Sequence, residues 1–363
     1  MRWGHGLIVG KFYPPHAGHH ALIDAAAAAC DRVTVVVAPS SRESVPLELR
    51  LTWLREAHPA HVRFVGGYDD HPVDYADPTA WERHTAVFRA VAGTDRVDAV
   101  FSSEAYGAEL ARRFGAQAVT VDLERMKVPV SGTAVRADPV ANWDLLGPGV
   151  RGWLTRRVIV VGAESTGTTT MAGALARHYR SRGGVWARTR WVPEFGRELT
   201  ARKLDQLRRT RPAATVEDVS WDRDDFLTVA AAQNAAEDTA AREGSPILFG
   251  DTDALATTIW EERYLSGGTG AWTVSAGVEA RVRAPALYLL THHERVPFVY
   301  DGLRDGEDVR AWMTARFERE LAARGVPSVV LTGCYAARLR AAVGACDDLL
   351  AAGWSFAPPL SHS

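Results

Sequence analysis

"VIVVGAESTGTTTMAGALARHY" (residues 158–179) combines a strand-like run, a glycine loop and a helix-like run. Its first four residues are β-branched and apolar, which is typical of a buried strand, and residues 171–179 have a helical composition. Between them, Gly162 and Gly167 have the spacing of a phosphate-binding loop, G-x-x-x-x-G-K-[ST]. The lysine of that pattern is replaced by Thr168. The stretch therefore predicts a nucleotide-binding α/β domain whose loop is altered.

The altered loop keeps its other parts. Thr169 occupies the position of the Mg²⁺ ligand, and the loop is completed by Glu164, Ser165, Thr166 and Thr170. In such loops the lysine contacts the β- and γ-phosphates, so we expect nucleotide binding to survive its loss more easily than phosphoryl transfer. Only three of the 42 basic residues are lysines, and arginine is the expected substitute. Arg304 is the first candidate for a replacement charge.

Short β-branched runs alternate with helical runs on both sides of this stretch, which predicts parallel sheets covered on both faces. Strands are expected at 7–9, 33–37, 62–65, 97–101, 185–191, 247–249, 286–290 and 328–331. The alternation pauses around "LGPGVRG" (146–152), the expected domain joint. We expect domains at 1–150 and 151–352, a flexible turn at 266–270 and a disordered tail at 353–363.

The stretch "GKFYPPHAGHH" (10–20) follows the first predicted strand and opens the first predicted helix. His16 and His19 share one face of the first helical turn, and Gly18 allows a ligand to approach the backbone. The position is typical of a phosphate site, because helix N-termini point there. A histidine-rich helix start without a ligand is the alternative, but the full spacing with Gly10, Lys11 and Phe12 argues against it.

A second anion site is expected at "VSGTAVR" (130–136). Ser131, Gly132 and Thr133 form a turn that opens a short helix, and Arg136 lies one turn along it. Alone this would be an ordinary helix cap. Together with the histidine motif it indicates a nucleotidyltransferase.

The motifs resemble the bifunctional nicotinamide-nucleotide adenylyltransferase and ribosylnicotinamide kinase family (NadR-type). The resemblance covers about residues 1–345 and includes, in the family's order, "GKFYPPHAGH", "FSSEAYG", "VSGTAVR", "GAESTGTTT", "WVPEFGREL", "GDTDALATT" and "DGLRDGE". It implies a Rossmann-like nucleotidyltransferase domain followed by a P-loop kinase-like α/β domain.

For the first domain the resemblance implies that nicotinamide mononucleotide attacks the α-phosphorus of ATP, which yields NAD and pyrophosphate. Because the attacking phosphate is already an anion, no general base is needed. Positioning and charge neutralisation by Mg²⁺, His16, His19, Lys11 and Arg136 are expected to carry the catalysis. The indole of Trp81 would either stack on the cationic nicotinamide ring of the substrate or simply pack its helix against the rest of the domain. Ser102 would contact the ligand or cap the next helix.

For the second domain the resemblance implies phosphorylation of ribosylnicotinamide at its 5′-hydroxyl. Asp251 and Asp253 follow a predicted buried strand, where a carboxylate base and a Mg²⁺ ligand are useful. Glu194 and Arg197 are expected on the ribose or acceptor side, and Asp301 and Arg304 on a lid over the phosphates. Three interpretations remain open: an intact bifunctional enzyme, an adenylyltransferase joined to a nucleotide-sensing domain, and a kinase with another acceptor.

The composition of the chain excludes several classes of protein. A net charge of -2 argues against a basic nucleic-acid binder, and three scattered cysteines (Cys30, Cys334 and Cys346) indicate a reduced, cytoplasmic setting. No membrane span or signal peptide is expected. The first strand begins near the start of the chain, so we expect neither the helix-turn-helix of some family members nor binding to DNA. A phosphopantetheine or polyol-phosphate nucleotidyltransferase is the competitor for the first domain, and a homo-oligomer is compatible with the sequence.

Overall fold

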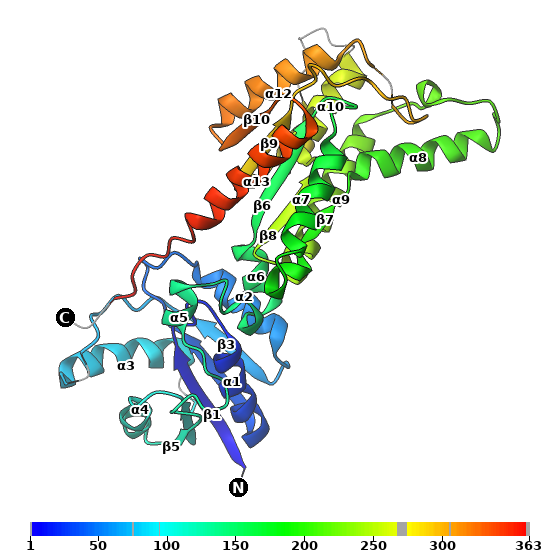
Figure 1. The fold of residues 1–363 in the computed structure, drawn as a ribbon. Helices are drawn as coiled ribbons and strands as arrows, with labels where there is room; N and C mark the ends of the chain where they lie inside the picture. The colour runs from blue at the N-terminus through cyan, green and yellow to red at the C-terminus, as the bar shows by residue number, and fades with distance from the viewer. Residues whose placement is uncertain (1, 75, 94, 267–273, 305, 361–363) are drawn as a thin grey trace. The chain divides into compact units, whose positions relative to one another are not determined.

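The computed structural model describes residues 2–74, 76–93, 95–266, 274–304 and 306–360. The chain forms two compact α/β units (Figure 1). The first consists of Met1–Val150 with Trp354–Ser363, and the second of Arg151–Gly353. The C-terminal segment therefore packs with the first unit. Except for Ser266, the turn predicted at 266–270 lies outside the described residues.

The first unit has a five-stranded parallel sheet in the order β3-β2-β1-β4-β5. This order places β1 in the middle, where the strand order reverses, as in doubly wound sheets. Its elements are β1 (Trp3–Gly10), α1 (Ala17–Ala29), β2 (Cys30–Val37), α2 (Leu47–Ala57), β3 (Val62–Gly66), α3 (Pro78–Ala92), β4 (Ala99–Ser102), α4 (Gly107–Phe114), β5 (Gln117–Thr120), α5 (Gly132–Ala137) and η1 (Trp143–Leu145). The short helix α6 (Pro148–Leu154) leads into the second unit.

Strand alternation divides the core of the first unit into two faces. Ile8 and Val35 belong to the cluster that holds the buried side chains of α1 and α2. Leu7 and Val36 belong to the opposite cluster, which includes Trp81 of α3 and buried residues of α4. Both faces of the sheet are therefore covered, as the apolar strands predict.

The second unit has a five-stranded parallel sheet in the order β10-β9-β6-β8-β7. The central strand β6 continues directly into the glycine loop and α7. The elements are β6 (Arg156–Gly162), α7 (Thr168–Arg180), η2 (Gly184–Arg188), β7 (Arg190–Val192), α8 (Phe195–Arg208), η3 (Val216–Asp218), α9 (Arg223–Glu243), β8 (Ile247–Asp251), α10 (Ala254–Ser266), α11 (Ala276–Glu279), β9 (Leu287–Thr291), α12 (Arg310–Arg324), β10 (Ser328–Leu331) and α13 (Tyr335–Ala351).

Two clusters again cover the two faces of this sheet. Val158 and Val160 pack with α7 and α13, whereas Ile159 and Val161 pack with α10 and α12. The central strand is thus buried on both sides, which fixes the start of the loop that follows it.

The strand expected at 185–191 is shorter than predicted. Gly183 and Gly184 have positive φ angles of 69° and 55°, and the chain then forms the 3-10 helix η2. Thr189 ends this turn by donating its hydroxyl to Trp186 O at 2.7 Å. Only afterwards does the chain join the sheet, as β7.

The predicted tail also differs from its expectation. Residues 354–360 have no regular structure but lie against the first unit. Tyr13 Oη donates to Ala357 O at 2.8 Å, and Ala357 N donates to Ser44 Oγ at 2.6 Å. The ring of Phe356 meets that of Tyr13 edge to face, with centroids 5.9 Å apart. Among the described residues, no helix is long and apolar enough to cross a membrane.

Candidate functional sites

The first unit has a pocket of about 730 Å³ at the carboxyl ends of its strands. Gly10 ends β1 and Ser102 ends β4, so the pocket lies where doubly wound sheets bind their ligands. The expected site residues that line it are Gly10, Lys11, Phe12, His19, Trp81, Ser102, Ser131, Gly132, Thr133 and Arg136. The structure thus brings together residues that are up to 126 positions apart in the chain.

His16 and Gly18 lie just behind this lining. The rings of His16 and His19 stack with centroids 3.7 Å apart and an angle of 27° between their planes. A Cβ on residue 18 would come within 3.2 Å of the His16 ring, so Gly18 allows this packing. The Nδ1 atoms of both histidines are buried without a hydrogen-bond partner. Two unpaired ring nitrogens at the start of α1 are suited to contact a polar ligand.

Both histidines are neutral at neutral pH. Burial lowers the pKa of His16 to about 4, with contributions from His20, Arg125 and Arg136. Burial also lowers the pKa of His19 well below its ordinary value, helped by the neighbouring His16. The expected neutralisation of phosphate charge by these imidazoles is therefore not available in the ligand-free protein. They act there as hydrogen-bonding groups.

Positive charge at this pocket comes from other side chains. Arg136 donates to Tyr13 O at 2.8 Å and to Thr133 Oγ1 at 3.2 Å, which fixes it at the rim. Lys11 Nζ lies 3.4 Å from Glu43 Oε1, and this carboxylate also pairs with a buried arginine. Arg125 lines the pocket as well, although it belongs to none of the motifs recognised in the sequence.

The position of Trp81 is compatible with both of its expected roles. It lines the pocket, but only 7% of it is exposed and it belongs to the packed cluster on α3. Ser102 lines the pocket too, and its hydroxyl donates to Glu104 O at 3.1 Å and accepts from Glu104 N at 3.0 Å. Ser102 therefore also organises the turn after β4.

Sequence reasoning missed two parts of the pocket wall. Asp69 lies between two histidines: its carboxylate oxygens are 2.5 Å from His84 Nδ1 and 2.9 Å from His71 Nδ1. The hydrogen bond that His84 donates to the Asp69 carboxylate raises the pKa of His84. Pro359 and Leu360 of the C-terminal segment form another part of the wall. A short motif identifies neither group, since the first lies in an irregular loop and the second is distant in sequence.

The phosphate-loop pattern of the second unit has the geometry that its glycines predict. A Cβ on Gly162 would lie 2.3 Å from Thr291 Oγ1, so only glycine fits at the end of β6. Gly167 has a φ of 93° and precedes α7. Thr166 Oγ1 donates to Ala163 O at 2.7 Å and bonds Thr291 Oγ1 at 2.7 Å. Thr166 is therefore buried beneath the loop and shapes it without lining the pocket.

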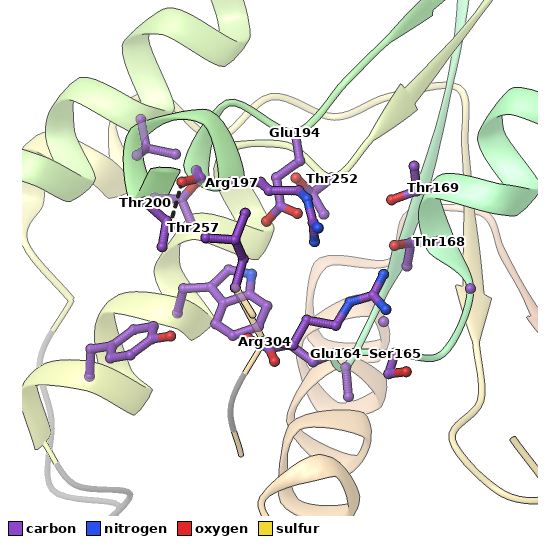
Figure 2. Close-up of a pocket in the computed structure, with 18 of the residues that line it drawn as sticks. Glu164, Ser165, Thr168, Thr169, Glu194, Arg197, Thr200, Thr252, Thr257 and Arg304 are labelled. Atoms are coloured by element: carbon purple, nitrogen blue, oxygen red, sulfur yellow. Dashed lines mark hydrogen bonds between the residues drawn. The ribbon is translucent and has the colours of Figure 1, made fainter. Parts of the chain in front are cut away.

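The pocket over this loop brings most of the expected residues together (Figure 2). Figure 2 shows the Arg304 guanidinium reaching toward Thr168, with Arg197 on the same side. Ser165 Oγ accepts from Val299 N at 2.8 Å, and Val299 O accepts from Arg304 at 3.2 Å. The expected residues that line the pocket are Gly162, Glu164, Ser165, Gly167, Thr168, Thr169, Thr170, Glu194, Arg197 and Arg304.

Three carboxyl groups, those of Glu164, Glu194 and Asp251, lie close enough at this site to affect one another's charge. Burial raises the pKa of Glu194 to about 8, and the charges of Asp251 and Glu164 add to the shift. Burial also raises the pKa of Asp251, against the opposing effect of the Thr169 and Thr168 hydroxyls. Asp251 Oδ1 is buried without a hydrogen-bond partner. Glu194 therefore carries a proton at neutral pH.

Three further expected residues lie outside the pocket lining: Asp251, which is buried, Asp253 and Asp301. Asp253 accepts a hydrogen bond from Ala256 N at 3.0 Å and another from Tyr288 Oη at 2.5 Å, so it caps α10 and is tied to β9. Asp301 forms an ion pair with Arg197 and lies 3.5 Å from Arg304 Nε. It holds the two arginines of the pocket together.

Comparison with known proteins agrees with this arrangement. The family described as "AAA domain" matches residues 157–338. The Trifunctional NAD biosynthesis/regulator protein NadR of Escherichia coli (strain K12) is 25% identical over 320 residues, which cover 82% of this chain and 71% of that protein. Its counterpart in Salmonella typhimurium (strain LT2) is 24% identical over 317 residues, with the same coverage.

Two solved structures share the fold across both units. A crystal structure of NadR protein in complex with NR has a TM-score of 0.67 and 21% identity, and covers 97% of each chain. A crystal structure of NadR protein in complex with NAD and AMP-PNP has a TM-score of 0.66 and 22% identity, and covers 97% of this chain and 98% of that one. The chain therefore belongs to the AAA domain family through residues 157–338, and it is similar to NadR proteins over most of its length.

Proposed function

We propose that this protein is a bifunctional enzyme of NAD biosynthesis. The first unit would transfer the adenylyl group of ATP to nicotinamide mononucleotide, and the second would phosphorylate ribosylnicotinamide with ATP. The observation that carries the proposal is that each unit has a pocket at the carboxyl ends of its strands, lined by residues of the motif expected for that reaction. NadR relatives with NR, NAD and AMP-PNP in their crystals support this choice of ligands.

In the first unit, a phosphate oxygen of nicotinamide mononucleotide forms a bond to the α-phosphorus of ATP. The bond from that phosphorus to the bridging oxygen breaks, and pyrophosphate leaves. No proton has to be removed from the nucleophile, so positioning and charge stabilisation suffice. His16 and His19, whose Nδ1 atoms are unpaired, supply hydrogen bonds, and Arg136 with Lys11 supplies positive charge.

In the second unit, the 5′-hydroxyl of ribosylnicotinamide attacks the γ-phosphorus of ATP, and ADP leaves. The hydroxyl proton must move to a base, and the carboxyl groups of Glu194 and Asp251 are the groups suited to take it. Arg304 and Arg197 line the same pocket, and the Arg304 guanidinium reaches toward Thr168 of the loop, where charge would accumulate on the transferring phosphoryl group. We assign Arg304 the charge that the loop lysine supplies elsewhere.

Magnesium is the ion that this chemistry implies, and the residues present fit it. Asp251 Oδ1 is buried and unpaired, and the hydroxyl of Thr169 acts on the same carboxylate. Thr169 and Asp251 would hold the ion. When bound, Mg²⁺ neutralises phosphate charge.

A second candidate function is favoured by Thr168. If no arginine reaches the phosphates, the second unit would bind nucleotide without transferring phosphate, and would serve as a nucleotide sensor fused to the adenylyltransferase. The carboxyl groups of Glu194 and Asp251 favour the intact enzyme, because a nucleotide sensor has no need for a group that accepts the proton of a substrate hydroxyl.

The test separates the two activities. The His16→Ala variant is prepared to silence adenylyl transfer, and is given ribosylnicotinamide, ATP and Mg²⁺. Nicotinamide mononucleotide and ADP are followed by mass spectrometry. Product at an ordinary turnover of about 1–100 s⁻¹ supports the kinase. Its absence, with NAD still made from the mononucleotide by the unaltered protein, supports the sensor.

The unaltered protein is assayed in parallel with nicotinamide mononucleotide, nicotinate mononucleotide and phosphopantetheine. We expect NAD and pyrophosphate from the first of these substrates. Turnover of phosphopantetheine alone would contradict the proposed function of the first unit.

A further inference from the structure

Two buried arginines lie behind the phosphate loop of the second unit. Arg310 is the first residue of α12 and is 7% exposed, and Arg338 is in the first turn of α13 and is 4% exposed. Neither belongs to a motif in the sequence. In the described part of the chain, neither forms an ion pair with a carboxylate. The charge of Glu307 reaches Arg310, but only from the surface.

Both guanidinium groups bond to main-chain carbonyls of the loop. Arg310 Nη2 donates to Ser165 O at 3.5 Å, to Val296 O at 3.0 Å and to His293 O at 3.4 Å. Arg338 Nη1 donates to Thr166 O at 3.2 Å, and its Nη2 donates to His292 O at 2.9 Å. These hydrogen bonds tie the carbonyl groups of Ser165 and Thr166 to the two arginines behind the loop.

This arrangement is unfavourable for the ligand-free protein in three respects. Each cation is removed from water without a counter-charge, which is costly even when it is hydrogen-bonded. Each lies at the N-terminal end of a helix, where the helix dipole disfavours positive charge. The two charges also act on each other, since Arg310 contributes to the pKa shift of Arg338. An anion in front of the loop would relieve all three penalties.

One polar atom remains to be explained. Arg310 Nε is buried with no hydrogen-bond partner, so the side chain is not fully satisfied by the loop and the 292–296 segment. If Arg310 served only to tie these segments together, its Nε–H would be expected to donate a hydrogen bond as well. Arginine keeps its charge under these conditions, because its ordinary pKa lies above 12.

We propose that Arg310 and Arg338 are positioning residues that hold the phosphate loop from behind and add fixed positive charge behind the bound nucleotide phosphates, in addition to the Arg304 charge on the pocket side. The proposal rests on the proposed function only in requiring that the loop binds a nucleotide. It differs from the role given to Arg304, which approaches the phosphates from the pocket side. The ligand chemistry is that of a nucleoside di- or triphosphate.

The test uses the full chain with Arg310→Met and Arg338→Met, which remove the charge but keep a long side chain. Arg319→Met and Arg340→Met, on exposed positions of the same two helices, are the matched controls. Because both units are expected to bind ATP, affinity is read from hydrogen-exchange protection of residues 158–179 during titration with ADP, and separately with adenosine.

We expect the ADP dissociation constant to rise about 10- to 100-fold in each buried-site variant and to stay unchanged in the controls, in line with the loss of one preorganised charge. Adenosine protection should change less than about twofold, because adenosine lacks phosphates. Thr168→Lys, introduced into the same variants, should restore most of the ADP affinity. Thermal unfolding of the ligand-free variants should occur at the same or a higher temperature, since a buried charge is lost.

Distinct results overturn distinct claims. If ADP affinity is unchanged in both buried-site variants, or if ADP and adenosine are weakened equally and Thr168→Lys restores neither, the arginines serve packing only and the inference is wrong. If residues 158–179 of the unaltered protein gain no protection from ADP, the proposed nucleotide site itself is wrong, and the inference falls with it. Normal ADP binding without kinase turnover contradicts the kinase alone and leaves the inference standing.

Discussion

The rings of His16 and His19 stack with centroids 3.7 Å apart at the start of α1, and the Nδ1 atom of each ring is buried without a hydrogen-bond partner. The pair can remain neutral because burial and the nearby arginines hold the pKa of His16 near 4. A catalytic group with this pKa is deprotonated throughout the physiological range. The site therefore depends on hydrogen bonding by these rings more than on their charge.

The first prediction follows from this neutrality. If an imidazolium were required, adenylyl transfer would decline as pH rises through about 6.5, the ordinary pKa of histidine. Because His16 loses its proton near pH 4, we expect kcat/KM for NAD formation to show no such decline between about pH 5.5 and 8. Initial rates across this range, with NAD measured by enzymatic cycling, check it. A fall centred near 6.5 that disappears in His16→Asn would contradict the neutral pair.

The second prediction concerns Glu194. Its pKa of about 8 means that the protonated form dominates at pH 7 and the carboxylate dominates above pH 8. If this carboxylate accepts the hydroxyl proton, kcat/KM of the kinase should rise about tenfold per pH unit below 8 and level off above it. Glu194→Gln should lose the rising limb and most of the activity.

The measurement is the rate of ADP release with ribosylnicotinamide between pH 6 and 9.5. Glu198→Gln, an exposed glutamate on α8, is the control and should keep the wild-type profile. A profile that is flat from pH 6 to 9 in the unaltered protein would exclude Glu194 as the base and leave Asp251.

The third prediction tests the cation on the pocket side. Arg304 is held at the loop by Asp301 and by a hydrogen bond to Val299 O, and the backbone N–H of Val299 donates to Ser165 Oγ. Removing a charge that acts on the transferring phosphoryl group costs about 10³-fold or more in kcat. We expect Arg304→Ala to lose at least this factor in kinase turnover and to leave adenylyl transfer unchanged.

Arg209→Ala, at an exposed position after α8, is the matched control for this variant. Single-turnover rates of ADP formation at saturating ATP separate the loss of chemistry from the loss of binding. A loss of less than tenfold for Arg304→Ala would mean that its guanidinium stays away from the phosphates.

The sequence predicts the parts of the two sites that lie in short, local motifs. Strand β6, the glycine loop and α7 are contiguous, so their spacing and hydrophobicity are enough to place them. Strand β5 (Gln117–Thr120) was missed because it is a short, mostly exposed edge strand without an apolar pattern. Periodicity identifies only strands that bury a face.

Residues that reach a site through tertiary packing are harder to predict. Asp69 lies in an irregular loop, and Leu360 comes from the end of the chain. In the sequence, Arg310 and Arg338 cannot be told apart from the many arginines on the surface. Only their burial in the structure distinguishes them. Asp253 shows the converse: it follows a strand in a recognisable motif, yet its carboxylate caps α10. Sequence position cannot separate a cap from a ligand.

The last prediction concerns the C-terminal segment of the first unit. Deleting residues 354–363 removes two hydrogen bonds that join Ala357 to Tyr13 and Ser44, together with the edge-to-face contact of Phe356. At about 1 kcal/mol per hydrogen bond and about 0.5–1.5 kcal/mol for the ring pair, we expect the first unit to lose about 2.5–3.5 kcal/mol of unfolding free energy.

The deletion should also raise KM for the substrates of adenylyl transfer, because Pro359 and Leu360 form part of the pocket wall. Urea unfolding followed by hydrogen exchange of β1 peptides measures the stability of this unit, and NAD formation gives KM. The Phe356→Ala variant of the full chain is the milder comparison, since it loses the ring contact and keeps the wall. Unchanged stability and KM in the deletion variant would show that the segment is detached from the first unit in solution.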